Sequence, residues 1–248
     1  MDLDDSRAAA LIHLISILPL LNVAPTYIFL ENVVGFEDSE SRKLLISCLL
    51  RMGYAIKEWH LSPVQFGIPN ERPRYYLTAE LSHLSIQMDH LSLGSPVIIK
   101  KFYKSYISRT LEEFLDSKNS DNLQLPVCLL KARKFISKSE ISKASDTRTK
   151  CFTKAYGHHG LHSGCFLMTK SVDDKELQII LEDPLEASKL LGLRMFSPEE
   201  ISRIHMFPKT FEFPSHISLQ QRWKLLGNSM NIMVVSELLA LLFKCNLR

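Results

Sequence analysis

The first 81 residues alternate between helical and extended patterns, and this alternation limits the possible folds more than any other feature of the chain. Asp5 or Ser6 can cap a first helix that runs to about Leu21. The apolar run Tyr27–Leu30 after it is typical of a strand buried on both faces. A helical stripe follows it, formed by Leu44, Leu45, Cys48, Leu49 and Met52, and Ser39 or Asp38 can cap this helix. Tyr54–Leu61 and Arg74–Leu81 have the composition of further strands. The order strand, helix, strand predicts a βαβ unit, and hence an α/β domain with a mostly parallel sheet.

The C-terminal part of the chain is again regular. Ser197 is followed by a proline and two glutamates, which predicts a capped helix that ends near Met206. The segment Gln221–Ser229 leads into a nearly all-apolar stretch that runs through Phe243, and such a helix is expected to be buried. The region between about Ser82 and Arg194 is weakly periodic, so we expect a smaller lobe there.

Composition excludes several classes of protein. The 248 residues are 46% hydrophobic with a net charge of +3, which argues against intrinsic disorder. The five cysteines form no Cys-x-x-Cys pair, which argues against a zinc ribbon and fits a reducing compartment. Met1–Arg7 is acidic, the wrong sign for a secretory or mitochondrial leader. The longest apolar stretches, Ala8–Leu21 and Met230–Phe243, are too short to span a membrane, so we expect a cytoplasmic or nuclear protein without a membrane partner.

Charge is unevenly distributed along the chain. Residues 1–50 carry three basic and seven acidic side chains, whereas residues 97–154 carry thirteen basic and six acidic ones, a net +7. The block 131–154 alone has eight basic residues against two acidic ones. Such a block is typical of a surface that faces a polyanion. A solvated lysine-rich face explains the charge equally well, and both interpretations stay open.

Glu31 directly follows the first predicted strand. In open parallel sheets, ligands bind beyond the carboxyl ends of the strands, where this carboxylate could hydrogen-bond a substrate. The alternative is an ordinary loop or capping acid. Further along, Arg72 and Arg74 flank Pro73, and at a strand start their guanidinium groups would project to the same side. Such a pair suits a phosphate or carboxyl group, with a structural ion pair as the alternative.

Cys151 lies between Lys150 and Lys154, and nearby positive charge favours a thiolate. The alternative is a small buried apolar side chain. Three histidines follow in the sequence, but their spacing to cysteines and carboxylates matches no known metal site, so no metal is expected. They are His158, His159 and His162.

The segment Leu226–Ser229 is predicted to open the buried C-terminal helix. Backbone amides at a helix N-terminus, together with the Asn228 and Ser229 side chains, would form a polar corner that faces a ligand. Simple helix capping by Ser229 is the alternative.

Taken in order, four stretches resemble the cytosine C5-methyltransferases. They are FLENVVGF (Phe29–Phe36), LSP with FGIPNERPRY (Leu61–Tyr75), CFTKAYG (Cys151–Gly157) and RWKLLGNS (Arg222–Ser229). The Cys-Phe-Thr stretch more narrowly resembles the branch that is similar to DNA methyltransferases but modifies tRNA-Asp. The resemblance covers nearly the whole chain.

The resemblance implies a Rossmann-like catalytic domain that uses S-adenosylmethionine, together with a small target-recognition domain. On this basis residues 1–95 are the C-terminal part of the catalytic α/β domain, whose sheet is incomplete at the N-terminus. Residues 96–195 are the basic target-recognition region, and residues 196–248 return to complete the catalytic domain.

The family's chemistry assigns roles to several residues. A cysteine thiolate in a Pro-Cys-Gln loop attacks C6 of cytosine, the Glu of Glu-Asn-Val hydrogen-bonds N3 and the exocyclic amine, and C5 then takes the methyl group. The resemblance implies that Glu31 is this acid, which must carry a proton for the role. Arg72 and Arg74 match the arginines that hold the base and its backbone, and Asn228 and Ser229 match the cofactor-side corner.

RNA contacts are expected in two places. The resemblance identifies Cys151 as the extra cysteine of the tRNA branch, in the recognition region. The other predicted RNA-binding residues are Thr153, Lys154, Tyr156, Lys131, Arg133 and Lys134.

The chain also departs from the family. No two glycines form a Gly-x-Gly and no cysteine follows a proline, so the family's cofactor loop and nucleophile loop have no match. The residues Asp5–Arg7 resemble the segment just after the nucleophile loop. We therefore expect that about the first quarter of the usual catalytic domain is missing and that the chain alone is inactive. The expected partners are tRNA, tRNA-Asp first, and a second polypeptide that supplies the missing segment.

Three alternatives stay open. The chain could be a non-catalytic RNA-binding remnant, or one half of a split methyltransferase. It could also keep the fold and act on DNA, although the Cys-Phe-Thr stretch and the small recognition region argue against DNA.

Overall fold

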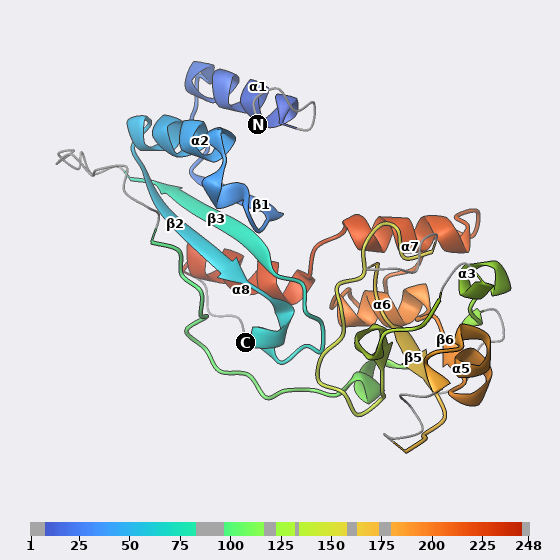
Figure 1. Cartoon of the computed structure of the whole chain (residues 1–248). Coiled ribbons are helices and arrows are strands. Elements are labelled where there is room, and N and C mark those ends of the chain that lie inside the picture. Colours follow the sequence, from blue (N-terminus) through green and yellow to red (C-terminus); the bar gives the residue numbers. More distant parts are fainter. Residues whose placement is uncertain are drawn as a thin grey trace. The chain divides into compact units, whose positions relative to one another are not determined.

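The computed structural model describes residues 8–82, 97–116, 123–131, 134–157, 163–173 and 180–244, which divide into two compact units (Figure 1). The first unit comprises Met1–Leu61, Pro73–Lys104 and Ser236–Arg248, and the second comprises Ser62–Arg72 and Ser105–Val235. These divisions do not coincide with the predicted boundaries at residues 95 and 195. The assignment of catalytic and recognition roles to parts of the chain stays a prediction.

The first unit is built on a three-stranded sheet in the order β1-β3-β2. The strands are β1 (Tyr27–Val33), β2 (Tyr54–Leu61) and β3 (Arg74–Leu81). β3 lies between the other two and pairs antiparallel with both. The prediction of a mostly parallel sheet is therefore wrong for these strands, because the short connection after Leu61 turns the chain back to insert β3. β1 and β2 still run in the same direction, as in an α/β fold.

Helix α2 (Glu40–Arg51) connects β1 to β2 and covers one face of the sheet. Its N-terminus confirms the predicted cap, since the Ser39 hydroxyl accepts a hydrogen bond from a first-turn N–H at 3.0 Å. Leu49 is fully buried against the sheet. Gly53 follows the helix with φ of +87°, the left-handed conformation that ends many helices.

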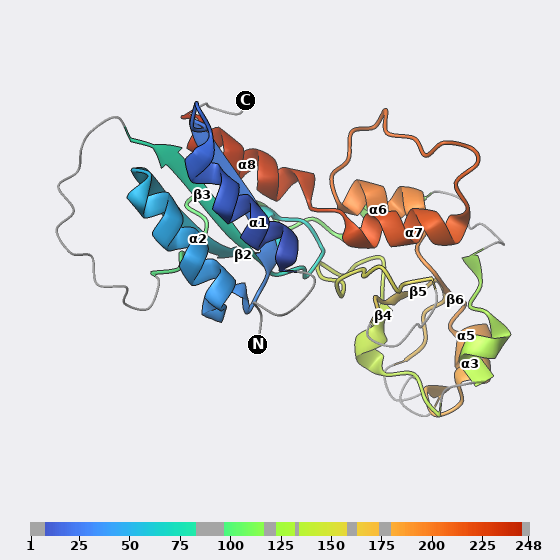
Figure 2. The same ribbon diagram turned by 90° about the horizontal axis from the view of Figure 1, so that it is seen from above.

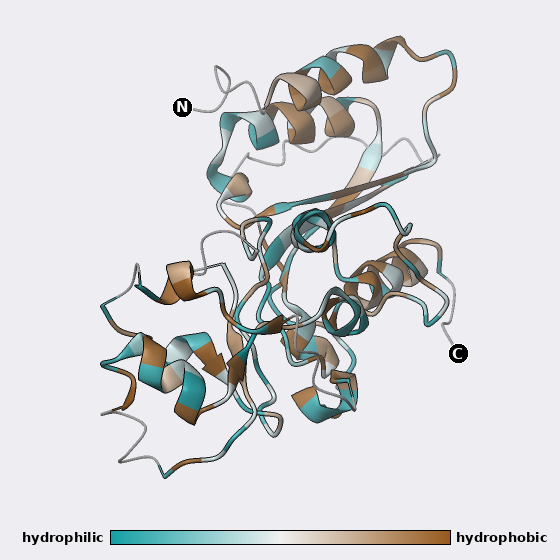
Figure 3. Ribbon diagram, turned by 90° about the vertical axis from the view of Figure 1, so that its right-hand side faces the viewer, coloured by the Kyte–Doolittle hydropathy of each residue, from teal (hydrophilic) through white to brown (hydrophobic). Residues whose placement is uncertain are grey.

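Two elements of the first unit are less buried than their composition suggests. Helix α1 (Ala9–Ile17) is strongly apolar, as the brown turns near the N-terminus in Figure 3 show, yet none of its residues is fully buried. β1 is only partly buried along its length, so the expectation that Tyr27–Leu30 is buried on both faces is wrong in this structure. The predicted caps Asp5 and Ser6 lie outside the described residues.

Helix α8 (Ile232–Leu242) enters the first unit at Ser236 and lies on the face of the sheet opposite to α2 (Figures 1 and 2). Leu238 is fully buried, as predicted for this apolar helix. Its carboxylate Glu237 is also buried and bonds the Lys104 ammonium at 2.9 Å. Beyond the helix, the Phe243 ring meets Tyr27 edge-on at 4.9 Å.

The second unit contains a small mixed sheet in the order β4-β5-β6. Its strands are β4 (Ile141–Ser142), β5 (Phe166–Met168) and β6 (Leu193–Arg194), and two short helices, α3 (Val127–Lys131) and α5 (Pro184–Leu190), accompany them. Phe166, Ala187 and Leu191 belong to the core between these elements. These elements lie in the region between Ser82 and Arg194, for which a separate smaller lobe stays a prediction.

Two further helices complete the second unit, α6 (Pro198–Ile204) and α7 (Leu219–Asn228). Ser197 caps α6 in a capping box with Glu200, which confirms the predicted helix start. The stretch Leu219–Leu242 has the length and apolar composition of a membrane span. The chain divides it between α7 and α8, because Ser229 adopts an extended conformation.

Candidate functional site

Three of the four motif stretches meet at Arg72, inside the second unit. The side chain is buried, with 3% of the residue exposed. Its Nη1 donates to the Phe152 carbonyl at 3.0 Å and to Cys151 Sγ at 3.2 Å. Its Nη2 donates to the Gly227 carbonyl at 3.0 Å and to the Ser229 carbonyl at 2.5 Å. Arg72 therefore joins the Cys-Phe-Thr stretch to the Leu-Gly-Asn-Ser stretch.

The position of Arg72 follows from the end of α7. The last carbonyls of a helix have no partner within the helix, and they carry the negative end of its dipole. Gly227 and Ser229 supply such carbonyls, and a cation placed there satisfies both requirements at once. Only Nε of the guanidinium lacks a partner. Most of the Arg72 N–H groups that could hold a substrate thus donate to acceptors within the protein.

Asn70 makes a second connection between the motif stretches. It is fully buried, and its amide donates to Thr149 Oγ1 and to the Lys150 carbonyl, both at 3.0 Å. Thr149 in turn donates to the Pro69 carbonyl at 2.9 Å. The segment before Arg72 is therefore fixed against the segment before Cys151.

Gly227 allows α7 to approach the Cys-Phe-Thr stretch backbone to backbone. A Cβ atom at this position would lie 2.2 Å from the carbonyl carbon of Thr153 and 2.3 Å from the nitrogen of Lys154. Because backbone atoms cannot move aside as a flexible side chain can, only glycine fits here. The glycine of Leu-Gly-Asn-Ser thus has a packing role that sequence reasoning did not identify.

Tyr156 lies in the core of the second unit, which corrects its predicted place on an RNA-recognition surface. Its hydroxyl donates to the Cys165 carbonyl at 2.8 Å and accepts from the Phe196 N–H at 2.9 Å. Burial raises the pKa of Tyr156 well above its ordinary value, and it raises the pKa of Cys165 to about 11. Gly164 leaves the room that the Tyr156 ring occupies, since a Cβ there would lie 2.5 Å from the ring.

Cys151 is partly buried, and the Arg72 guanidinium contacts its sulfur. The flanking lysines were expected to serve this purpose. Instead, Lys150 donates to Ser139 Oγ at 3.0 Å, and Lys154 is exposed. Thr153 Oγ1 accepts from the Ala155 N–H at 3.3 Å and so stabilises the turn. The contact between Arg72 and Cys151 joins residues 79 apart in the sequence, and no local pattern predicts it.

The predicted polar corner at Asn228 and Ser229 has a different geometry. Asn228 is the last residue of α7 and Ser229 ends that helix, so neither lies at a helix N-terminus. The amide of Asn231 instead caps α8, with its oxygen accepting from the Val234 N–H at 3.4 Å. The predicted cap Ser229 therefore lies two residues before the observed cap Asn231, because both residues are good helix caps and the local sequence does not choose between them.

Ser229 is held by protein groups on both sides. Its hydroxyl donates to the Leu226 carbonyl at 2.6 Å and contacts His205 Nδ1 at 3.0 Å. His205 is fully buried at the end of α6, and sequence reasoning missed it. Asn228, by contrast, is exposed and can contact a ligand.

In the first unit, the structure brings Glu31 and Arg74 together. Glu31 lies opposite Tyr76, so Arg74, two residues earlier on β3, is its diagonal neighbour on the same face. Arg74 Nε lies 3.2 Å from Glu31 Oε1, and about a fifth of each side chain is exposed, 17% and 24% respectively. Arg72 and Arg74 thus take different partners rather than forming the predicted pair.

A buried ionic network occupies the other face of β3. Glu58 accepts two hydrogen bonds from Arg42, at 2.9 and 2.6 Å, and one from the Tyr75 hydroxyl at 2.5 Å. Burial and the bond to Glu58 raise the pKa of Tyr75 well above its ordinary value. This network and the core under α2 fix β3, and with it the position of Arg74 on the opposite face.

The remaining predicted residues lie on the surface or outside the described part. Lys131 and Lys134 are exposed, as RNA contacts require. Arg133, His158, His159 and His162 lie outside the described residues. Within the described ranges, no group of three or more His, Cys, Asp or Glu side chains is arranged to hold a metal ion.

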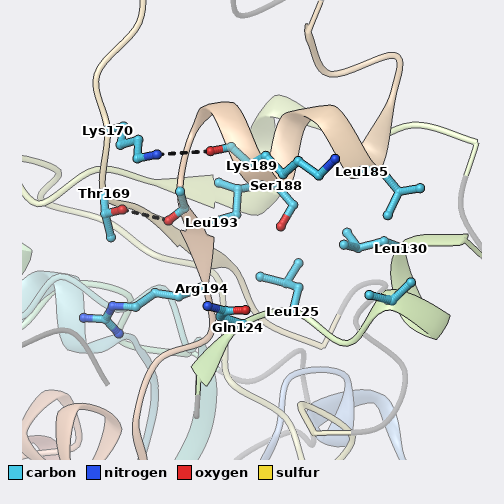
Figure 4. Close-up of a pocket in the computed structure, with 12 residues that line it drawn as sticks. Gln124, Leu125, Leu130, Thr169, Lys170, Leu185, Ser188, Lys189, Leu193 and Arg194 are labelled. Atoms are coloured by element: carbon cyan, nitrogen blue, oxygen red, sulfur yellow. Dashed lines mark hydrogen bonds between the residues drawn. The ribbon is translucent and has the colours of Figure 1, made fainter. Parts of the chain in front are cut away.

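A cavity of about 450 Å³ lies elsewhere in the second unit, between α3, α5 and β6 (Figure 4). Leu125, Leu130 and Leu193 supply apolar walls, and Lys170 lies at its edge. The Lys170 ammonium donates to the Lys189 carbonyl at 3.4 Å, as a dashed line in Figure 4 shows. No residue of the four motif stretches lines this cavity.

Comparisons with known proteins agree with the motif order. The family model of the C-5 cytosine-specific DNA methylases matches residues 2–244. The chain is 32% identical over 252 residues to a tRNA (cytosine(38)-C(5))-methyltransferase of Spodoptera frugiperda, covering 98% of this chain and 74% of that protein. It is 31% identical over 284 residues to a protein of Dictyostelium discoideum named DNA (cytosine-5)-methyltransferase, covering 99% and 73%.

A solved structure shows the same fold. The crystal structure of a Spodoptera frugiperda DNMT2 mutant superposes with a TM-score of 0.82 at 33% identity, covering 98% of this chain and 74% of that one. The α/β, Rossmann-like fold class predicted from the sequence is thereby confirmed.

Proposed function

This chain belongs to the family of C-5 cytosine-specific methyltransferases, and we propose that it takes part in transferring a methyl group to a cytosine in the anticodon loop of a tRNA, tRNA-Asp first. The observation that carries the proposal is the meeting of three motif stretches at Arg72, which builds the tRNA-branch Cys-Phe-Thr into the same core as Leu-Gly-Asn-Ser. The relative named as a tRNA methyltransferase supports the substrate.

Glu31 is the residue proposed to contact the base. Attack at C6 of cytosine pushes electrons toward N3, and an acid at that position stabilises the developing charge. Glu31 lies within β1, two residues before the strand ends and not after it as predicted, and is partly exposed, so it can reach a ligand. Its partner Arg74 holds the carboxyl group in place and can itself contact the base or its backbone. Arg72 acts through the segments it joins and is a positioning residue.

The family uses S-adenosylmethionine, which supplies the methyl group. The predicted cofactor residues fit this ligand only in part. Asn228 is exposed and offers an amide, whereas the Ser229 hydroxyl and carbonyl are already bonded within the protein. We assign Asn228 as this chain's cofactor contact, whereas the glycine-rich loop and the nucleophile loop have no match within these 248 residues. The exposed apolar side chains of α1 offer a segment that carries those loops a surface.

The tRNA contact is proposed to lie on the basic block. Lys131, Lys134 and Lys154 are exposed, and each phosphate they neutralise releases counterions. An anticodon-loop cytosine is unpaired, so extruding it costs less than from a duplex. Replacing Lys131 and Lys134 together by alanine should reduce the magnitude of the salt slope by about two. The salt slope is the slope of the logarithm of the tRNA binding constant against the logarithm of the salt concentration. An unchanged slope would show that the block is only a solvated face.

DNA is the second candidate substrate, because one relative carries the name DNA (cytosine-5)-methyltransferase. The deciding experiment supplies a family N-terminal segment to this chain and measures transfer of labelled methyl groups. A tRNA-Asp transcript, the same transcript with its anticodon-loop cytosine replaced by uracil, and a duplex DNA are compared. We expect labelled methyl groups only in the tRNA-Asp transcript that keeps its anticodon-loop cytosine. Equal or greater labelling of the DNA would overturn the proposal.

A further inference from the structure

We infer that an open pocket beside Phe135, in the second unit, binds one unpaired nucleotide of the RNA, an inference that rests on the proposed function. The pocket has a volume of about 550 Å³, within the range of roughly 300–1,000 Å³ typical of small-ligand sites. Its aromatic ring is that of Phe135, and its charged side chains are Lys134, Lys138 and Glu182. The comparisons and motif assignments above give Phe135, Lys138 and Glu182 no role.

The fold places Phe135 outward at a fixed position. The next residue, Ile136, is 1% exposed and belongs to the core, and its N–H donates to the Leu181 carbonyl at 3.0 Å. Leu181 also lines the pocket, so the core forms its floor. Phe135 itself is 61% exposed, and folding therefore gains little from a phenyl ring there.

Tyr103 in the first unit is the matched comparison. It is also 61% exposed and lies beside a lysine, Lys104, whose ammonium is 5.7 Å from the ring centre. Lys104, however, is paired with Glu237, and Tyr103 lines neither of the two pockets described above. Within the described residues, Lys134 has no ion-pair partner. The aromatic ring and the available cation thus coincide at Phe135 and not at Tyr103.

The charges of the pocket give a bound nucleotide an orientation. The ammonium groups of Lys134 and Lys138 can donate hydrogen bonds to a phosphate. The capping box between Ser137 and Glu140 fixes the turn that carries Lys138. Glu182 repels a phosphate but can accept a hydrogen bond from the exocyclic amine of a base. A base stacked on Phe135 would therefore direct its phosphate toward the lysines and its amine toward Glu182.

This combination favours single-stranded RNA over the other polyanions. Every base has a face that stacks on an aromatic ring, and such stacking tolerates any sequence. Paired bases in an A-form helix have no free face, so a duplex would use the lysines alone. An acidic peptide would likewise use the lysines and leave the ring without a partner.

The test replaces Phe135 with tryptophan in the full chain and measures its fluorescence. The native tryptophans, Trp59 and Trp223, are buried, and the unsubstituted chain provides their background. A tRNA-Asp anticodon stem-loop should quench the new tryptophan, whereas a blunt RNA duplex and oligoglutamate should not. The same substitution at Tyr103 should give no quenching. Equal quenching by the duplex or by oligoglutamate would overturn the inference.

Binding of the stem-loop provides the second readout. Phe135→Ala should weaken it about tenfold, because one stacked base is lost, and should leave the salt slope unchanged. Lys134→Ala should lower the slope by about one, and Tyr103→Ala should change neither quantity. If Phe135→Ala binds as the unsubstituted chain does, the pocket has no such role, while methyl transfer to tRNA decides the proposed function separately.

Discussion

Arg72 and Arg74 are two residues apart, yet the two units use them in opposite ways. Arg72 is 3% exposed and donates to four acceptors on two distant segments. Arg74 pairs with one carboxylate, Glu31, at the partly exposed edge of a sheet. The first arrangement holds a fold together, and the second presents charges to a ligand. Motif arginines that look equivalent in the sequence therefore divide into a structural and a functional one.

The largest expected effect comes from removing the two arginines in turn. Arg72→Met leaves two buried and two partly buried acceptors without their donor. At about 1–3 kcal/mol for each buried acceptor, it should cost about 2–6 kcal/mol of unfolding free energy. Arg74→Met breaks one partly exposed ion pair and should cost about 1 kcal/mol. Urea unfolding of both variants measures the difference. Equal losses would remove the distinction between the two residues.

Two glycines sharpen the comparison between the units. Gly227→Ala forces a methyl group into backbone atoms 2.2 Å away and should cost about 2–3 kcal/mol. Gly35 in the first unit has φ of +100° but nothing within 4 Å of its Cβ position, so Gly35→Ala should cost only the strain of about 1 kcal/mol. Urea unfolding measures the loss of unfolding free energy in both variants. A milder effect at Gly227 than at Gly35 would show that α7 does not pack as described.

Tyr156→Phe should give a smaller loss, because it removes one hydroxyl that bonds Cys165 and Phe196. We expect about 1–2 kcal/mol. The pKa of Tyr156 is raised in the folded state, so above about pH 10 the unfolded state loses a proton that the folded state keeps, and stability falls as pH rises. Tyr156→Phe should reduce this alkaline loss, which unfolding at pH 9 and pH 11 measures.

Much of the local structure could be predicted because its causes are local. Ser39 and Ser197 cap helices with side chains that bond their own first turn, and the sequence shows both signals. The alternative of a structural ion pair holds for Arg74, although no pattern in the sequence names Glu31 as its partner.

The failures have nonlocal causes. The insertion of β3 between β1 and β2 depends on pairing across the sheet, which apolar patterns do not encode. The break at Ser229 is fixed by groups of Arg72 and His205, which lie far away in the chain. Tyr156 looked like a recognition residue because its motif is functional, whereas its surroundings are buried.

The central claim is that Glu31 acts on the base while the cluster around Arg72 and Cys151 supports the fold. The direct measurement is methyl transfer to a tRNA-Asp transcript by this chain completed with a family N-terminal segment. Glu31→Gln keeps the shape but loses the acid, so the rate should fall on the order of a hundredfold or more. Cys151→Ala should lower the rate less, through recognition or packing of the loop. Near-full activity of Glu31→Gln, or a greater loss in Cys151→Ala, would contradict the claim.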